Sequence, residues 1–307
     1  MPTVNFTRER SLYKAFSEQA VKARQTELAQ IQEQLSTNRR VNRPSDDASA
    51  FAQARQLEAL GERYAQYQRS IDSARSWSDH SQQSLDELAD LFTQVYEEAV
   101  RFSNGTYSDS DRQSGVKTLQ SLLGTITDQL NTRVNGEYLF AGSRTTVKPF
   151  TLDTATSEIT YNGNDGGRER HIGRDVTLNI NISGEDLFNL DAAAIPPVTL
   201  SSVMNDLLVA VGSGDPVELE AALGGIELAR NHVVDLGGEA GNIGQRLLVA
   251  ERQLADTVLL NETRRVDVEG IDLAETLFRQ QQAQTGLQTS LRVAANVLQT
   301  SLLDYLR

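Results

Sequence analysis

The sequence contains no cysteine, which excludes disulfide bonds, thiolate nucleophiles and cysteine-based zinc sites. Only three histidines occur, His80, His171 and His232, and none has a second histidine at the spacing of metal ligands on a helix. Aromatic residues make up only 6% of the chain, which is low for a compact globule and closer to long helices packed in register. We therefore expect no metal and no cofactor.

No apolar run approaches the length of a membrane span, and the first ten residues lack the apolar segment of a secretory signal. The chain has 29 lysine and arginine residues against 42 aspartate and glutamate residues, a formal net charge of −13. Nucleic acids and anionic membranes select for basic surfaces, so neither is expected as a partner. We expect a soluble chain that is cytoplasmic, or exported without a cleaved signal peptide.

Two stretches, about residues 11–135 and 199–307, are rich in Ala, Leu, Gln, Glu and Arg and have few helix breakers. The proline-free run from Ser45 to Phe102 predicts one helix of roughly 85 Å, with Asn104-Gly105 as its stop. The polar run Ser108-Asp109-Ser110-Asp111 is expected to cap a further amphipathic helix that folds back on this rod. Six glycines between residues 224 and 244 are expected to interrupt the helical pattern of the second stretch.

The region between the two stretches, about residues 141–197, is rich in Gly, Thr, Asn, Asp and Val. Residues 159–161 and 171–172 flank the turn-rich run 162–167, which predicts a loose hairpin. Residues 176–182 alternate apolar and polar side chains, which is typical of a half-buried antiparallel strand. The sequence therefore predicts a mainly α chain with a small inserted antiparallel β domain.

Both ends of the chain have apolar residues at heptad spacing, which favours packing against a partner helix. Because each seam is narrow and lies at an extreme end, we interpret both as an assembly interface between subunits. The predicted interface residues are Val21, Leu28, Ile31, Leu35, Leu273, Leu277, Leu287, Leu291, Leu298 and Leu302.

Between the first seam and the long helix lies a dense basic cluster, residues 39–43, which Pro44 separates from the helix. No aromatic residues interleave with it, so we interpret it as a solvated or intermolecular salt-bridging joint and not as a nucleic-acid site. Ser45 is expected to cap the long helix, with two acidic residues in its first turn. The predicted joint residues are Arg40, Asn42, Arg43, Pro44, Asp46 and Asp47.

No catalytic site is predicted. Asp46, Asp47 and the Ser/Asp run 108–111 could form acid–base pairs, but both groups lie where helix starts need hydrogen-bond acceptors. The glycine-rich run 162–167 leads toward a strand, whereas a phosphate-binding loop opens a helix and usually has a lysine. We expect no enzyme activity.

Seven segments together resemble the bacterial flagellin family, and several of them resemble its hook–filament junction branch. The segments are residues 40–48 (RVNRPSDDA), 99–112 (AVRFSNGTYSDSDR), 134–142 (VNGEYLFAG), 148–150 (KPF), 161–164 (YNGN), 267–272 (DVEGID) and 294–307 (AANVLQTSLLDYLR). The resemblance extends over nearly the whole chain.

The resemblance implies a structural adaptor with a terminal coiled coil (residues 1–42 and 272–307), a long antiparallel helical bundle (43–143 and 198–271) and an inserted β domain (144–197). It implies as partners further copies of this chain, the first hook-associated protein, flagellin and a flagellar export chaperone. It also implies an extracellular place at the hook–filament junction, reached through the flagellum's own type III export channel. The alternatives are a short filament-forming flagellin and a cytoplasmic coiled-coil scaffold unrelated to flagella.

Overall fold

The computed structural model describes residues 4–103 and 107–305, and for residues 4–11, 13, 14 and 297–305 it describes the backbone alone. The expected helix stop, Asn104-Gly105, lies outside the described residues. The described chain is mainly helical with short antiparallel β ladders, which confirms the predicted fold class. It divides into two compact units, Met1–Arg63 with Thr257–Arg307, and Tyr64–Asp256.

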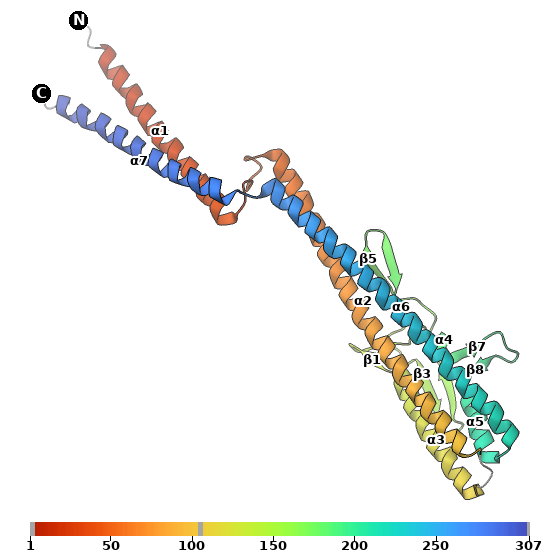
Figure 1. The fold of residues 1–307 in the computed structure, drawn as a ribbon. Helices are drawn as coiled ribbons and strands as arrows, with labels where there is room; N and C mark the ends of the chain where they lie inside the picture. The colour runs from red at the N-terminus through yellow and green to blue at the C-terminus, as the bar shows by residue number, and fades with distance from the viewer. Residues whose placement is uncertain (1–3, 104–106, 306–307) are drawn as a thin grey trace. The chain divides into compact units, whose positions relative to one another are not determined.

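The first unit brings the two ends of the chain together. Helix α1 (Val4–Thr37) packs lengthwise against α7 (Leu273–Tyr305), and the two helices lie side by side in Figure 1. The unit also contains the start of α2 (Ala48–Arg101) and the end of α6 (Pro216–Glu269). There the buried Asn261 donates from Nδ2 to the carbonyl oxygen of Leu57 at 3.0 Å, which links α6 to α2.

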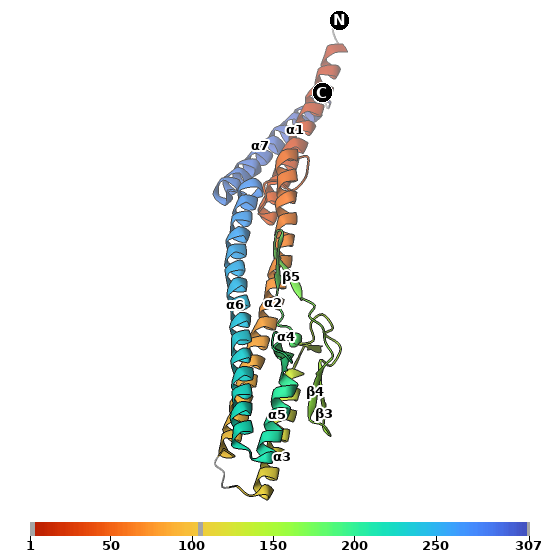
Figure 2. The ribbon, with the colours of Figure 1, turned by 90° about the vertical axis from the view of Figure 1, so that its right-hand side faces the viewer.

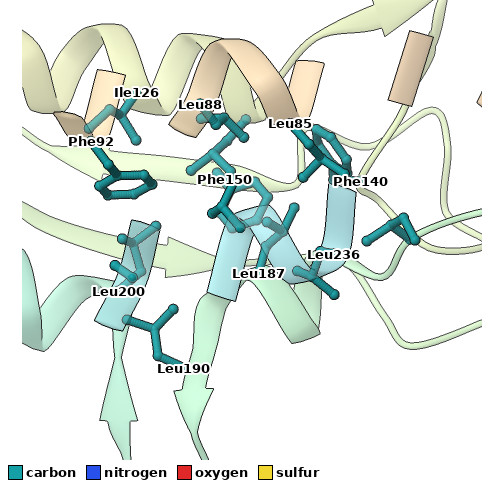
Figure 3. Packing of buried hydrophobic residues seen from close by; sticks show 14 of the residues in the cluster. Leu85, Leu88, Phe92, Ile126, Phe140, Phe150, Leu187, Leu190, Leu200 and Leu236 are labelled. Atoms are coloured by element: carbon teal, nitrogen blue, oxygen red, sulfur yellow. The ribbon is translucent and has the colours of Figure 1, made fainter. Parts of the chain in front are cut away.

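The second unit is built on four helices, the remaining parts of α2 and α6 together with α3 (Asp109–Leu130) and α5 (Leu200–Ser213), which run alongside one another in Figure 2. Each helix turns an apolar face inward, as the period of its buried residues requires. Figure 3 shows the centre of this core, where the β elements also bury apolar side chains. The labelled residues are Leu85, Leu88, Phe92, Ile126, Phe140, Phe150, Leu187, Leu190, Leu200 and Leu236.

Helix α3 begins at the predicted cap. The Ser108 side chain accepts a hydrogen bond from the Asp111 amide, and the Asp111 carboxylate accepts one in return from the Ser108 amide at 3.1 Å. The Ser108 hydroxyl also donates to this carboxylate at 2.6 Å, and the hydrogen bonds from the hydroxyl and then the amide hold the pKa of Asp111 below its ordinary value. The Ser/Asp run therefore stabilises the start of a helix, as the sequence predicts.

Helix α6 is continuous from Pro216 to Glu269, so the expectation that its glycines interrupt it is wrong. Buried apolar residues at helical spacing anchor the glycine-rich stretch on both sides, and this packing outweighs the low helix propensity of glycine. Some of the glycines face neighbouring helices. Ser78 of α2 donates from Oγ to the carbonyl oxygen of Ala240 at 3.0 Å, and a Cβ on Gly244 would lie 3.7 Å from the same Oγ.

Two adjacent glycines of α6 should respond in opposite ways to alanine. Gly224 faces open space, so Gly224→Ala is expected to stabilise the protein by about 0.5–1 kcal/mol through helix propensity. A Cβ on Gly225 would lie 3.2 Å from Cγ1 of Val203, so Gly225→Ala is expected to lose that gain. Thermal unfolding of both variants by circular dichroism checks this. Equal stabilisation by the two substitutions would contradict the packing of α5 against α6.

The inserted β elements form four separate two-stranded ladders and one short helix, α4 (Gly184–Phe188). The pairs are β1 (Arg133–Val134) with β2 (Glu137–Tyr138), β3 (Phe150–Asp153) with β4 (Glu158–Tyr161), β5 (Glu169–Gly173) with β6 (Val176–Asn179), and β7 (Asn189–Asp191) with β8 (Val198–Thr199). All four pairs are antiparallel. The strand predicted over residues 176–182 is present but ends at Asn179.

The predicted hairpin across residues 162–167 is wrong, because β4 pairs back with β3 and β5 pairs forward with β6. Each of these strands meets its partner through a shorter turn, and the β5–β6 turn is Arg174-Asp175 with Asp175 at φ 57°. The run 162–167 instead covers Gly142, where Asn164 accepts from the Ser143 amide at 2.8 Å. Gly142 has φ 66° and no space for a Cβ beside Asn164, so glycine is required there.

Arg168 fastens the insert to helix α2. Its guanidinium lies 4.0 Å from the centre of the ring of Trp77, which is buried on α2. It also donates to the Glu137 carboxylate at 2.6 Å, while its backbone amide donates to Asn181 at 2.6 Å. The cation–π contact and the ion pair hold the Arg168 side chain between Trp77 of α2 and Glu137 of β2.

The pair of Glu137 and Arg168 predicts an acid dependence of stability. The hydrogen bond from Arg168 holds the pKa of the Glu137 carboxyl below its ordinary value of 4.5. The pair therefore stabilises the fold fully above pH 4.5, and this stabilisation is lost as pH falls through the lowered pKa. We expect the difference in unfolding free energy between the unchanged chain and Glu137→Gln to be constant above pH 5 and to shrink below about pH 4. A difference that does not change with pH would contradict the pairing.

Candidate assembly surface

Within the described residues, no group of three or more histidine, aspartate or glutamate side chains is placed to hold a metal ion. No helix among them is both long and apolar enough to cross a membrane. The features that stand out are apolar stripes on the terminal helices and a charged network where α1 ends and α2 begins.

Helix α7 has two adjacent stripes, and the structure separates their roles. The inner stripe packs toward α1 and is mostly small or polar: Thr276, Gln280, Ala283, Leu287, Ser290 and Ala294. The second stripe lies beside it and contains three of the leucines that the sequence places in the interface. Leu273 is 56% exposed, Leu277 49% and Leu291 47%, whereas Leu287 belongs to both stripes and is half-buried.

Helix α1 contributes the other half of the pair. Ile31 is 2% exposed, and the predicted interface residues Val21, Leu28 and Leu35 are half-buried. Toward the start of α1, Leu12 and Phe16 are exposed. A row of exposed large apolar side chains is unusual on a soluble monomer and marks a contact surface. The predicted interface residues Leu298 and Leu302 lie outside the residues whose side chains the structure describes.

The close approach of α1 and α7 depends on small residues of the inner stripe. Gly286 lies opposite Arg24 of α1, and a Cβ there would lie 3.7 Å from the Nε atom of that arginine. Ala283 is buried against the same helix. The contact between the helices is formed mostly by small side chains, whereas Leu273, Leu277 and Leu291 face outward.

The start of α2 is capped by Asp47, not by Ser45 as the sequence led us to expect. The Asp47 carboxylate accepts from the Ala50 amide at 2.9 Å, which is the contact of a helix N-cap. Asp46 instead closes the turn around Pro44, accepting from the backbone amides of Asn42 at 3.0 Å and Arg43 at 2.9 Å. Asp46 thus accepts from the amides of the turn before α2, and Asp47 accepts from an amide in the first turn of the helix itself.

Each arginine of the basic cluster has an acidic partner within the chain, although its side chain stays between 38% and 66% exposed, and the role between subunits stays a prediction. Arg43 forms an ion pair with Glu33 at 2.9 Å, and Arg40 lies 3.7 Å from Asp47. Arg39 lies 3.4 Å from the buried carboxylate of Glu269, which Arg265 also approaches at 3.5 Å. The arginines therefore tie the segment after α1 to the end of α6.

Backbone contacts reinforce this joint. The Arg40 amide donates to the carbonyl oxygen of Glu269 at 2.6 Å, and its side chain donates to that of Val268 at 3.1 Å. Gln34 is buried and donates from Nε2 to the carbonyl oxygen of Arg40 at 3.0 Å. Sequence reasoning missed Glu269, because a lone acidic residue in a helical stretch gives no signal of a partner more than 200 residues away. It also missed Gln34, whose partner Arg40 is close in sequence but lies beyond the end of α1.

Comparisons with known proteins agree with this architecture. Residues 13–145 match the family model described as the bacterial flagellin N-terminal helical region. The chain is 26% identical to "Flagellar hook-associated protein 3" of Salmonella typhimurium over 297 residues, which is 91% of this chain and 92% of that protein. The protein of the same name from Escherichia coli K12 matches with the same identity and coverage.

Solved structures share the fold. A flagellar hook-associated protein from Vibrio parahaemolyticus superimposes with a TM-score of 0.65 at 20% identity, covering 73% of this chain and 100% of that one. The "flagellar junction protein FlgL" of Legionella pneumophila gives a TM-score of 0.58 at 15% identity, covering 71% and 99%. Taken together, the chain is similar to the flagellin family over residues 13–145 and to hook-associated proteins over nine-tenths of its length, and it is a structural component of the bacterial flagellum and not an enzyme.

Proposed function

We propose that this chain is the adaptor that joins the hook, through the first hook-associated protein, to the flagellin filament. The observation that supports this most strongly is the match to two hook-associated proteins 3 over nine-tenths of both lengths. Filament proteins match less of the chain: a 41 kDa filament core protein of Borreliella burgdorferi is 33% identical over only 34% of it. The adaptor therefore fits better than a short filament-forming flagellin.

The terminal helices supply the proposed assembly interface. The α1–α7 pair presents Leu273, Leu277 and Leu291 on its surface, and stacked subunits would remove these side chains from water. Burial of a fully exposed leucine contributes about 1.5–3 kcal/mol, so covering the exposed half of each of these side chains would contribute about half of that per leucine to assembly. Leu298 and Leu302 extend the same sequence pattern and are proposed to belong to the interface.

We propose the division into a terminal coiled coil (residues 1–42 and 272–307), a helical bundle (43–143 and 198–271) and a β domain (144–197). In this arrangement the coiled coil stacks between subunits, and the joint from Arg40 to Asp47 fixes the start of the bundle. The network around Glu269 supports a stiff joint, because a buried carboxylate with two arginine partners resists rearrangement.

The same apolar surface supports one further partner before assembly. A chain that exposes leucines on its terminal helix needs cover in the cell, which favours a flagellar export chaperone as a partner. Export through the type III channel of the flagellum, followed by assembly at the hook–filament junction, accounts for the chain's final location. The absence of cysteine suits a chain exported unfolded, because it cannot form wrong disulfides on the way.

The test is electron microscopy of the purified chain mixed with isolated hooks, with and without the first hook-associated protein, and separately after adding salt to promote polymerisation. Retention at hook ends only when the first hook-associated protein is present, without long filaments, is the expected result. Long filaments of this chain alone would identify a flagellin. Neither filaments nor retention would instead favour a scaffold unrelated to flagella.

A further inference from the structure

Charge is distributed unevenly between the two units. Residues 64–256 contain 28 aspartate and glutamate residues against 14 lysine and arginine residues, a net charge of −14, although the whole chain has only −13. Copies assembled side by side would repel one another through such a unit unless some acidic groups meet basic groups on the neighbouring copy. The second unit should therefore contain a complementary pair of surfaces.

The acidic member of the pair lies along α2. Five exposed carboxylates follow one line on this helix, at spacings of seven, seven, four and seven residues: Asp72, Asp79, Asp86, Asp90 and Glu97. At about 1.5 Å per residue this acidic stripe is roughly 38 Å long. Among the described residues none of the five forms an ion pair, and Asp72 only accepts a hydrogen bond from Gln68 at 3.0 Å.

The basic member is a groove between α2 and β5, with a volume of about 530 Å³. Arg69 contributes a guanidinium from α2, and Arg170 contributes another from β5, on the same strand face as the buried Ile172. Ser70 and Ser73 line the α2 side with hydroxyls that can donate to a carboxylate. Glu169 and His171 also line the groove and are exposed.

Both arginines have donors available for an incoming acid. Arg69 donates to the neutral amide oxygen of Gln66 at 2.6 Å, and Arg170 donates to the carbonyl oxygen of Glu169 at 3.3 Å. Neither forms an ion pair among the residues that the structure describes. In a unit with twice as many acids as bases, two arginines that form no ion pair within the described part of the chain and line one groove are a surface that fits an acidic partner.

We propose that this groove receives the acidic stripe of α2 from a second copy of the chain. Ser70 and Ser73 lie roughly a third to half a turn around α2 from the acidic stripe, so one copy can present both surfaces at once. A contact between two different surfaces repeats from copy to copy and gives a ring or a helix. This inference rests on the proposed function, since it places a lateral contact between subunits of the assembled junction.

Cysteine cross-linking tests the contact, because the chain has no cysteine of its own. The double variant Ser73→Cys with Asp86→Cys puts one thiol in the groove and one in the stripe, thirteen residues apart on the same helix. At about 20 Å they cannot bridge within one copy. On chains retained at hook ends, mild oxidation is expected to give a ladder of dimers and larger species on non-reducing gels. The control pair Ser73→Cys with Lys117→Cys should stay at least fivefold less cross-linked.

Charge reversal provides a second test. Arg170→Glu is expected to reduce retention at the hook about tenfold, and adding Asp79→Arg to the same chain should restore most of it. Lys117→Glu makes the same change of charge on α3, outside both surfaces, and should leave retention within about twofold. If Arg170→Glu does not fold, as judged by its thermal unfolding, Arg69→Glu replaces it because Arg69 is exposed.

The outcomes separate the two proposals. Failure of the unchanged chain to bind the hook would overturn the proposed function. Normal retention together with an absent ladder, or with a ladder equal to that of the control pair, would overturn the groove contact alone. Normal retention of the Arg170→Glu variant would also overturn the groove contact.

Discussion

Replacing Leu277 or Leu291 by aspartate is expected to abolish retention of the chain at the hook while the free protein still folds. Both side chains are about half exposed, at 49% and 47%, so a carboxylate at either position is solvated in the free chain. In stacked subunits the same carboxylate would be buried without a partner, which costs several kcal/mol, about 3 or more, for each subunit. Electron microscopy of hook ends, with circular dichroism of the free variants, checks both parts of this expectation.

Leu291→Met is the matched control, because methionine keeps an apolar side chain of similar volume and should assemble like the unchanged chain. Leu28→Asp is a different test: Leu28 is half-buried between α1 and α7, so an aspartate there should also loosen the helix pair. Normal retention of Leu291→Asp would show that the exposed leucine stripe is not the assembly surface.

The position of this stripe could be predicted only in part from the sequence. Heptad spacing identifies a helix with an apolar side, but Leu287 fits two neighbouring stripes equally well. The structure places Thr276, Ala283 and Ser290 toward α1, because small side chains permit close approach of two helices. A pattern search weighted by side-chain size selects the leucines for the contact between α1 and α7. When two helices approach closely, however, the leucines are the side chains that lie outside that contact.

The turns and helix ends show a second reason why sequence reasoning succeeds or fails. The polar run 108–111 predicts a cap, and the structure forms it between Ser108 and Asp111, three residues apart, within the range where local chemistry decides. At the start of α2 three successive candidates, Ser45, Asp46 and Asp47, could each cap a helix. The turn at Pro44 uses Asp46 and leaves Asp47 for the helix, which depends on the backbone path and not on residue type.

Glycine in α6 shows how packing overrides local preference. Six glycines in about twenty residues predict a break, yet Ile226, Val233, Leu236 and Leu247 bury one face of an uninterrupted helix. Each glycine costs up to about 1 kcal/mol relative to alanine, whereas each buried aliphatic side chain contributes about 1.5–3 kcal/mol. Side-chain burial therefore outweighs the low helix propensity of glycine wherever a core of this size lies along the helix.

Gly184→Ala is expected to be among the most destabilising single methyl additions in the second unit. Gly184 begins α4 directly after its cap Ser183, and a Cβ there would overlap the carbonyl oxygen of Phe140. It would also lie 2.6 Å from the Cε2 atom of the Tyr161 ring. Phe140 is fully buried, so its backbone cannot withdraw without disturbing the core shown in Figure 3. Overpacking of this kind costs about 2–3 kcal/mol.

A loss of that size should lower the midpoint of thermal unfolding by roughly 5–10 °C for a unit of nearly 200 residues. Trp77 is the only tryptophan and lies against Arg168 of the insert, so its fluorescence reports on this unit specifically. Gly224→Ala adds the same methyl group on an open face and should raise the midpoint slightly. Because the two variants differ only in what the methyl group meets, equal midpoints would mean that α4 does not pack against Phe140. A lowered midpoint for Gly184→Ala alone would locate the loss at that contact.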